Sequence, residues 1–106
     1  NRSELFTGYF TKHGDSGVDI LPIGNLVKKQ VRELAAYLGV PQVIIDKAPS
    51  AGLWAGQTDE GEMGFTYEAL DNYILTGEAP ADLKKRIDTA HTRSAHKRTV
   101  APIPDF

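Results

Sequence analysis

The stretch "GNLVKKQVRELAAYLGVP", residues 24 to 41, predicts an amphipathic helix. Its apolar side chains recur at the spacing of one helical face: Val27, Val31, Leu34, Ala35 and Leu38. We expect Asn25 to cap the N-terminus, and Gly39 and Pro41 to end the helix. Lys28 and Lys29 then lie in the first turn, where the helix dipole disfavours cations, so a negative partner is expected beside them.

The residues alone leave two interpretations of these lysines open. A helix N-terminus with free backbone amides is a ready site for phosphate, and the ammonium group of Lys28 would add a mobile positive charge to it. Alternatively, both lysines point into water and destabilise the helix by roughly a few tenths of a kcal/mol.

Length and composition restrict the classes of protein to which the chain can belong. Its 106 residues suffice for one modest domain, and 41% hydrophobic with 25% charged residues is typical of a globular protein. The net charge of −2 argues against a nucleic-acid partner, and no apolar run approaches the ~20 residues of a membrane span. Because cysteine is absent, we exclude disulfides, thiolate metal sites and a cysteine nucleophile, which fits a cytoplasmic protein.

The chain opens with "NRSELFTGYF", a dense sequence without a starting Met. We therefore expect a piece of a longer protein, and a native N-terminus exposed by processing is the alternative. Ser3 is the expected cap of a first helix, which Gly14 and Gly17 are expected to end. Its buried face is predicted to hold Leu5, Phe6, Tyr9 and Phe10.

Two further helices are predicted in the second half of the chain. Thr66 is a plausible cap of the first, and Phe65 and Leu70 occupy the two positions of a hydrophobic staple. Gly77 is expected to end it, and Pro80 to start the next. The apolar side of that last helix is formed by Leu83, Ile87 and Ala90. With "PQVIID" as another short turn, the local picture is four or five helices and hardly a strand.

Residues 48 to 64, "APSAGLWAGQTDEGEMG", predict a long loop, because they contain four glycines and no helical period. A loop of this length in a compact domain is usually functional or disordered. Trp54 is unfavourable in water, so we expect it either to enter the core or to close over a ligand. The acidic residues Asp59, Glu60 and Glu62 are most simply a solvated face.

Three other positions are candidates for ligand chemistry. Glu4, at the start of a helix, could hold Mg²⁺ or merely complement the dipole. Lys12 and Asp19 flank "HGDSG" and could bind an anion and a hydroxyl, or belong to a solvated loop. The basic run at residues 96–98, "HKR", could bind phosphates, or be ordinary surface charge. There is no P-loop, dinucleotide fingerprint or serine elbow, so no single motif names a reaction.

Several separated segments, taken together and in order, are more specific. "NRSE" followed by "GYFTKHGDSGVDILPIGNLVKKQVRELAAYLGVP" closely resembles the C-terminal part of the ammonia-dependent NAD synthetase family. "APSAGLWAGQTDEGEMGFTYEALDNY" and "HKR" resemble the same family in the same order, so the resemblance covers essentially the whole chain. Two departures are visible: "GDSG" stands where two glycines are expected after Asp15, and Gly61 stands where an acid is common.

The resemblance implies an α/β fold. Residues 1–106 would form a single incomplete domain, the mostly helical C-terminal portion of a Rossmann-like adenine-nucleotide fold of the N-type ATP pyrophosphatase class. Its parallel sheet, and the Ser-Gly-Gly loop that cradles the ATP phosphates, would lie largely upstream, so this piece alone should not catalyse. The family is usually a tight homodimer, and residues 48–64 would be its mobile active-site loop.

The resemblance also implies a ligase reaction in NAD biosynthesis. ATP adenylates the nicotinate carboxylate of deamido-NAD and releases pyrophosphate; ammonia then attacks the activated acyl carbon, and AMP leaves. The alternatives are the synthetase domain of a glutamine-dependent NAD synthetase and a small helical interaction module without enzymatic activity. Sequence upstream of Asn1 would separate the ammonia-dependent from the glutamine-dependent synthetase, since the amidase domain of the latter would have to lie there.

Matching motif positions imply roles for seven residues. The ATP contacts are Lys28 and Ser50. The deamido-NAD contacts are Lys12, Asp19, His96 and Lys97. Glu4 falls at the position of a Mg²⁺ ligand. On this interpretation the negative partner of Lys28 is an ATP phosphate, supplied by the ligand rather than by the protein. No role follows for Asp59, Glu60 or Glu62.

Overall fold

A computed structural model describes all residues 1–106 and contains helices but no strand. The elements in chain order are α1 (Arg2–Thr7), α2 (Lys28–Tyr37), α3 (Gln42–Ile45), α4 (Asp59–Met63), α5 (Tyr67–Thr76), α6 (Ala81–Arg93) and the 3₁₀ helix η1 (Ala95–Lys97). The prediction of a helical chain is confirmed, with one more α-helix than the upper expectation. No helix is both long enough and apolar enough to cross a bilayer.

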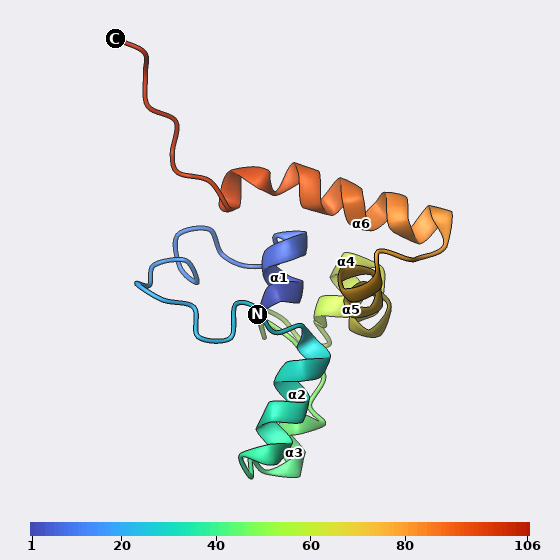
Figure 1. The fold of residues 1–106 in the computed structure, drawn as a ribbon. Helices are drawn as coiled ribbons and strands as arrows, with labels where there is room; N and C mark the ends of the chain where they lie inside the picture. Colours follow the sequence, from blue (N-terminus) through green and yellow to red (C-terminus); the bar gives the residue numbers. More distant parts are fainter.

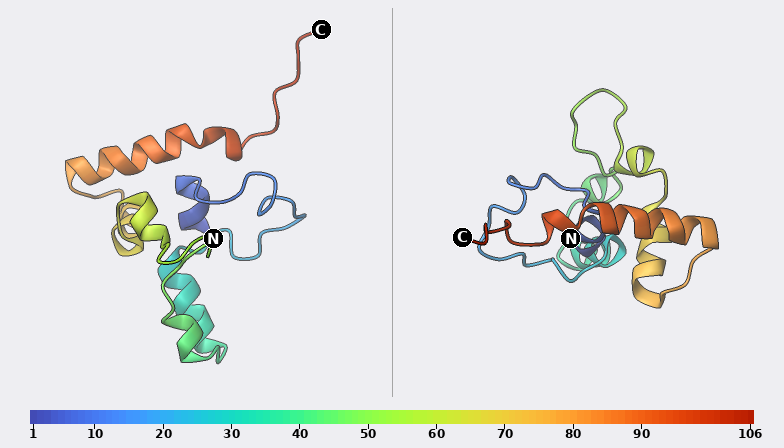
Figure 2. Two further views of the ribbon diagram at one scale, coloured as in Figure 1. Left: turned by 180° about the vertical axis from the view of Figure 1, so that it is seen from behind. Right: turned by 90° about the horizontal axis from the view of Figure 1, so that it is seen from above.

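The short helix α1 lies at the centre of the arrangement (Figure 1). It packs against α6 on one side and α5 on the other, while α2 packs against α5 and α3. Helices α2 and α3 project away from this body, and the residues after η1 extend away from it on the opposite side (Figures 1 and 2). The elements therefore meet around α1 and around the first turn of α2.

The hydrophobic core is small. Its fully packed members are Tyr67, Leu70 and Ile87. The partly buried residues against them are Phe6, Met63, Phe65, Tyr73, Ile74 and Leu83. The radius of gyration, 15.2 Å, exceeds the roughly 13 Å of a compact domain of this length. Large apolar side chains on α2, α3 and the turn between them are exposed, namely Tyr37, Leu38, Val43 and Ile44.

Helices α5 and α6 follow the local sequence rules that predicted them. The Thr66 hydroxyl accepts a hydrogen bond from the Ala69 amide at 3.1 Å, so Thr66 is the N-cap of α5. Gly77 ends α5 in the left-handed conformation at φ 76°, which glycine adopts without strain. Helix α6 begins directly after Pro80, and its predicted apolar side faces the core through Ile87.

The boundaries predicted for α1 are wrong at both ends. Asn1, not Ser3, is the N-cap, since its side-chain oxygen accepts from the Glu4 amide at 3.1 Å. The helix ends at Thr7, because Gly8 takes a left-handed φ of 73°. A Cβ on Gly8 would also collide with the side chain of Ser94. The predicted terminators, Gly14 and Gly17, lie far beyond this end.

The first turn of α2 is capped by side chains from two other helices. Asn25 is not the cap; Val27 occupies that position, and its amide donates to Gln30 Oε1 at 3.0 Å. The Lys28 amide donates to Ser3 Oγ of α1 at 2.9 Å. The Lys29 amide donates to Asp71 Oδ2 of α5 at 2.8 Å, and Ser3 Oγ donates to Asp71 Oδ1 at 2.5 Å.

Residues 48–64 are only partly a loop. The last of them form α4, capped by the Thr58 hydroxyl, which accepts from the Gly61 amide at 3.1 Å. The acidic residues Asp59, Glu60 and Glu62 therefore lie in a first helical turn, where the dipole favours negative charge. The prediction of a structureless acidic segment is wrong here, because three carboxylates stabilise a helix start despite the central Gly61.

We predict that Asp71→Asn lowers the free energy of unfolding by about 1–3 kcal/mol, because the buried carboxylate has two donors and an amide group would lose one of them. Thermal or denaturant unfolding of the variant and the wild type measures the difference. Asp105→Asn, in the exposed C-terminal segment, is the matched control. Equal stability of the Asp71 variant and this control would contradict the capping role.

Candidate functional site

An open cavity of ≈ 560 Å³ lies beside α1, α2 and α3. Three of the seven predicted site residues line it: Glu4, Lys28 and Ser50. Part of its wall is apolar, through Val31, Ile44 and Pro49. A concave site that combines apolar surface with a few charged groups is the usual form of a small-molecule site. The structure thus brings together the residues predicted for ATP and Mg²⁺.

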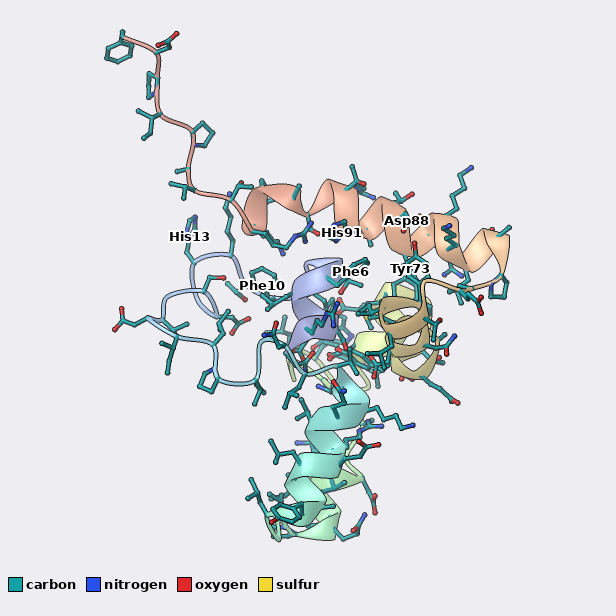
Figure 3. The ribbon with its side chains drawn as sticks, in the orientation of Figure 1. Phe6, Phe10, His13, Tyr73, Asp88 and His91 are labelled. Carbon is teal, nitrogen blue, oxygen red and sulfur yellow. The ribbon has the colours of Figure 1, made fainter.

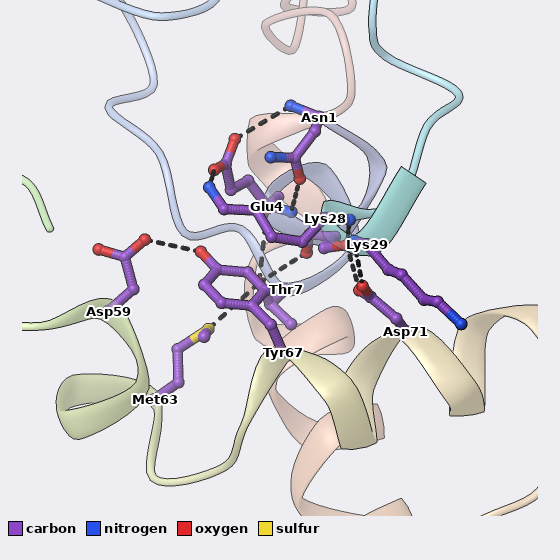
Figure 4. A network of polar contacts seen from close by, with 10 residues as sticks. Asn1, Glu4, Thr7, Lys28, Lys29, Asp59, Met63, Tyr67 and Asp71 are labelled. Atoms are coloured by element: carbon purple, nitrogen blue, oxygen red, sulfur yellow. Dashed lines mark hydrogen bonds and ion pairs between the residues drawn. The ribbon is translucent and has the colours of Figure 1, made fainter. Parts of the chain in front are cut away.

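Lys28 points into the protein and Lys29 points out. The Lys28 side chain is 18% exposed, and its Nζ lies 3.0 Å from Glu4 Oε1 and 5.0 Å from the centroid of the Tyr67 ring. The Lys29 side chain is 74% exposed. The interpretation that both lysines point into water is therefore wrong for Lys28. Figure 4 shows Lys28 between the carboxylate and the ring.

The protein itself supplies the negative charge that the first turn of α2 requires. The Asp71 carboxylate accepts a hydrogen bond from the Lys29 amide, and the Glu4 carboxylate forms an ion pair with the Lys28 ammonium group. The prediction that only a bound phosphate meets this need is wrong. The backbone amides of Lys28 and Lys29 already have partners, so the side chain of Lys28 is the part of this turn that remains adaptable.

The carboxylate of Glu4 is half-buried and strongly engaged. Its Oε1 accepts from Lys28, and its Oε2 accepts from the Asn1 nitrogen at 3.0 Å. Burial by itself raises the pKa of Glu4, but the hydrogen bonds from Lys28 and the Asn1 nitrogen, with the positive charge of Lys28, outweigh it, so the pKa lies below its ordinary value of 4.5. Glu4 is therefore a carboxylate at neutral pH.

The structure does not offer Mg²⁺ a ready cage of protein ligands. No group of three or more histidine or acidic side chains gathers at one point. Mg²⁺ bound with nucleotides commonly takes one or two carboxylates and completes its shell with phosphate oxygens and water. Glu4 fits this requirement as a single ligand, provided that Lys28 releases its carboxylate.

Tyr67 and Asp59 form a second polar pair, which reaches the cavity through Asp59. The Tyr67 hydroxyl donates to Asp59 Oδ2 at 2.7 Å, and both side chains are buried (Figure 4). Burial, followed by the hydrogen bond and charge of Asp59, raises the pKa of Tyr67, so the hydroxyl remains a donor. Sequence reasoning missed this pair, because Tyr67 resembles any apolar residue that follows an N-cap and Asp59 lies in an acidic run.

The segment between α3 and α4 is closed at its base. The Asp59 amide donates to the Pro49 carbonyl at 2.9 Å. The buried Gln57 accepts from the Leu53 amide at 2.6 Å and donates to Glu62 at 2.9 Å. The segment stands out from the helices (Figure 2, right) and carries the exposed Trp54, which has not entered the core. Its mobility remains a prediction.

The residues predicted for deamido-NAD lie outside this cavity. Lys12 Nζ and His96 Nδ1 are 3.0 Å apart, so the structure brings together two residues that are 84 positions apart in sequence. Asp19 is exposed in the segment between α1 and α2. None of these three lines the ≈ 560 Å³ cavity.

Residues 97 and 98 fix the C-terminal end of α1. Lys97 Nζ donates to the carbonyls of Gly8 and Phe10, both at 2.7 Å, and Arg98 donates to the Leu5 carbonyl at 3.0 Å. Cations at this end satisfy free carbonyls and oppose the negative end of the dipole. The interpretation of these two cations as ordinary surface charge is therefore wrong.

Helix α6 also holds α1 in place, through His91. His91 stacks on Phe6 with ring centroids 4.2 Å apart, and its Nδ1 lies 2.8 Å from the Phe6 carbonyl oxygen. Figure 3 shows Phe6 of α1 directly beneath His91 of α6, with Tyr73 of α5 beside them. Glu4 is therefore carried on a short helix that is held by α5, α6 and the segment after α6.

Known proteins share this sequence and this arrangement. The profile of the NAD synthase family matches residues 1–101. The chain is 60% identical over 104 residues to the NH(3)-dependent NAD(+) synthetase of Carboxydothermus hydrogenoformans, covering 98% of this chain and 43% of the relative. It is 56% identical over 107 residues to the protein of the same name from Archaeoglobus fulgidus, covering 97% and 43%.

A solved structure agrees with these matches. The structure of NMN synthetase from Francisella tularensis matches with a TM-score of 0.93 and 54% identity, over 100% of this chain and 44% of that chain. The chain thus spans less than half the length of each of these relatives.

We predict that the Glu4–Lys28 pair stabilises the protein at neutral pH and loses this effect in acid. Because folding lowers the pKa of Glu4 below 4.5, the contribution is complete above that value and disappears as pH falls through the lowered pKa. Unfolding temperatures of wild type and Glu4→Gln, measured from pH 7 to pH 3, should therefore converge in acid. Glu33→Gln, on the exposed face of α2, is the control; a wild-type advantage that persists unchanged at pH 3 would contradict the assignment.

Proposed function

The chain belongs to the NAD synthase family, and on this basis we propose that it carries part of a site for the ATP-dependent amidation of deamido-NAD. In the proposed reaction, ATP adenylates the nicotinate carboxylate and releases pyrophosphate. Ammonia then attacks the acyl carbon, AMP leaves and NAD is formed. The observation that carries the proposal is the cavity lined by Glu4, Lys28 and Ser50, in a chain 60% identical to a protein named NH(3)-dependent NAD(+) synthetase.

The chemistry of the reaction explains why such a site needs cations. A free carboxylate is a poor acyl donor because oxide would have to leave, whereas an acyl adenylate expels AMP. Negative charge builds up on the phosphates as the adenylate forms, so fixed positive charges lower the barrier. Lys28 is suited to this role, because a half-buried ammonium group interacts more strongly with an anion than one in bulk water does.

We propose that nucleotide binding exchanges the partners of the Glu4–Lys28 pair. Lys28 would turn to a phosphate oxygen of ATP, and Glu4 would become one oxygen ligand of a Mg²⁺ ion. Mg²⁺ supplies neutralisation of the phosphate charge when bound. The exchange replaces one 3.0 Å ion pair by two charge-paired contacts, so neither charge is left buried without a partner. Ser50, which also lines the cavity, would add a hydroxyl contact.

Lys12, Asp19, His96 and Lys97 are proposed to serve deamido-NAD. The Lys12–His96 pair offers two nitrogens within 3.0 Å of each other for one anionic or polar group. Lys97 already donates one hydrogen bond to the Gly8 carbonyl and one to the Phe10 carbonyl. A lysine ammonium group has three N–H donors, so one donor of Lys97 remains for a hydrogen bond to a ligand. The location of these residues outside the cavity is consistent with a second subsite for a long dinucleotide.

The rest of such an enzyme is proposed to complete the fold. Relatives more than twice as long leave room for the parallel sheet and the phosphate-binding loop expected upstream. The open shape and the apolar side chains exposed on α2 and α3 support packing against further protein, including the second subunit of a homodimer. We therefore propose a cytoplasmic enzyme in which this chain alone is inactive and residues 48–64 close over the substrates.

A second candidate substrate is nicotinate mononucleotide. The Francisella tularensis relative, with a TM-score of 0.93, is named an NMN synthetase, and the same adenylation and amidation would apply to a mononucleotide. The names of the other relatives favour the dinucleotide and ammonia. A glutamine-dependent synthetase remains the alternative for the nitrogen source.

A direct assay separates these possibilities. We predict that the intact enzyme, given ATP, Mg²⁺ and ammonium, has a higher kcat/KM for deamido-NAD than for nicotinate mononucleotide, and that glutamine does not replace ammonium. The measurement is amide product and AMP formed with each acceptor. A preference for the mononucleotide would reassign the substrate, and the absence of AMP formation with either acceptor in folded enzyme would contradict an amidating ligase.

We predict that Lys28→Ala reduces kcat/KM for ATP by about 10- to 100-fold, the range expected when a hydrogen bond to a charged group is lost. Lys29→Ala is a matched control, because this lysine shares the first turn but extends into solvent. Steady-state kinetics with varied ATP at saturating acceptor give the comparison. If both alanine variants retain the wild-type kcat/KM for ATP, Lys28 does not bind the nucleotide.

A further inference from the structure

We propose that Tyr67 is a positioning residue that holds the Lys28 ammonium group at the cavity wall; this inference rests on the proposed role of Lys28 in ATP binding. Tyr67 opens α5 and is only 2% exposed. Its ring lies 5.0 Å from Lys28 Nζ. At this distance, the negative face of an aromatic ring attracts a cation.

Asp59 fixes the ring from its other end. The Tyr67 hydroxyl donates to the buried Asp59 carboxylate at 2.7 Å. The Asp59 amide is itself tied to the Pro49 carbonyl at 2.9 Å, so the acceptor belongs to the closed base of the segment between α3 and α4. The ring thus has a hydrogen-bonded tip and one face toward Lys28, as Figure 4 shows, and Tyr67 belongs to the packed core.

This arrangement suits a lysine that has to change partners. A free lysine side chain samples many rotamers, and it loses much of this entropy when it is fixed on a ligand. Glu4 holds Lys28 in the structure, but in the proposed nucleotide complex Glu4 moves to Mg²⁺. The Tyr67 ring then remains beside the ammonium group. An aromatic face attracts the cation without neutralising it, so the full positive charge stays available to a phosphate.

The decisive comparison is Tyr67→Leu against Tyr67→Phe in the intact enzyme. Both variants lack the hydroxyl, and only the second keeps the ring. We expect KM for ATP to be about fivefold higher in Tyr67→Leu than in Tyr67→Phe, the size of a partly desolvated cation–π contact, with a smaller change in kcat. If circular dichroism shows that Tyr67→Leu does not fold, Tyr67→Met replaces it.

A double-mutant cycle separates positioning from loss of structure. If Tyr67 acts through Lys28, the difference between the leucine and phenylalanine variants disappears in a Lys28→Ala background. Tyr73→Leu and Tyr73→Phe are the matched controls. Tyr73 lies in the same helix, contacts the core and donates to Asp88 at 2.6 Å, but its ring pairs with that of Phe6 rather than with Lys28. These two variants should have equal KM values for ATP.

Two outcomes would overturn the inference. One is an equal KM for ATP in the leucine and phenylalanine variants at position 67. The other is a difference that persists unchanged without Lys28, which would mean that the ring only supports the fold. A Lys28→Ala enzyme with a wild-type KM and kcat for ATP would instead contradict the proposed role of Lys28, so the two failures are distinguishable.

Discussion

The first turn of α2 is the point on which the described structure depends, because it concentrates positive charge where three helices meet. Two backbone amides and the ammonium group of Lys28 face inward there. Ser3 from α1, Asp71 from α5 and Glu4 from α1 supply the oxygens that these donors need. Unpaired buried donors and charges are costly, so each of these contacts also fixes the position of a helix. The core itself is too small to do this alone, since only three apolar residues form its packed centre.

The two carboxylates at this turn, Asp71 and Glu4, have different roles. Asp71 accepts hydrogen bonds from the Lys29 amide and the Ser3 hydroxyl. Neither donor can turn away without unfolding the start of α2. Glu4 binds the end of a long, flexible side chain, which can rotate toward the cavity. The structural cap and the ion pair that we propose to exchange are thus separate, although they lie in one turn. A helix N-terminus whose amides are already capped can present a lysine to a phosphate without the amides taking part.

The sequence was most informative where the determining contacts are local. The Thr66 cap, the glycine that ends α5 and the proline before α6 are fixed within a few residues, and these predictions are confirmed. The prediction of the α2 N-cap failed for the opposite reason: the capping side chains of Ser3 and Asp71 lie 25 and 42 positions away in the chain. Three site residues were found in one cavity, but their positions came from the family resemblance. No local pattern could show that Tyr67 lies against Lys28, because that contact depends on how α2 and α5 pack.

Helix α1 shows how far apart the determinants of the site lie. Six residues are too few for a stable helix on their own, since nucleation is unfavourable and propagation has little length in which to compensate. The C-terminal half of α1 is nevertheless held by Arg98 on the Leu5 carbonyl and by His91 on the Phe6 ring and carbonyl. The geometry at Glu4 therefore depends on contacts with residues up to 93 positions away in the chain. The basic segment 96–98, placed beside Lys12 by the same contacts, joins the proposed dinucleotide subsite to the helix that carries the proposed Mg²⁺ ligand.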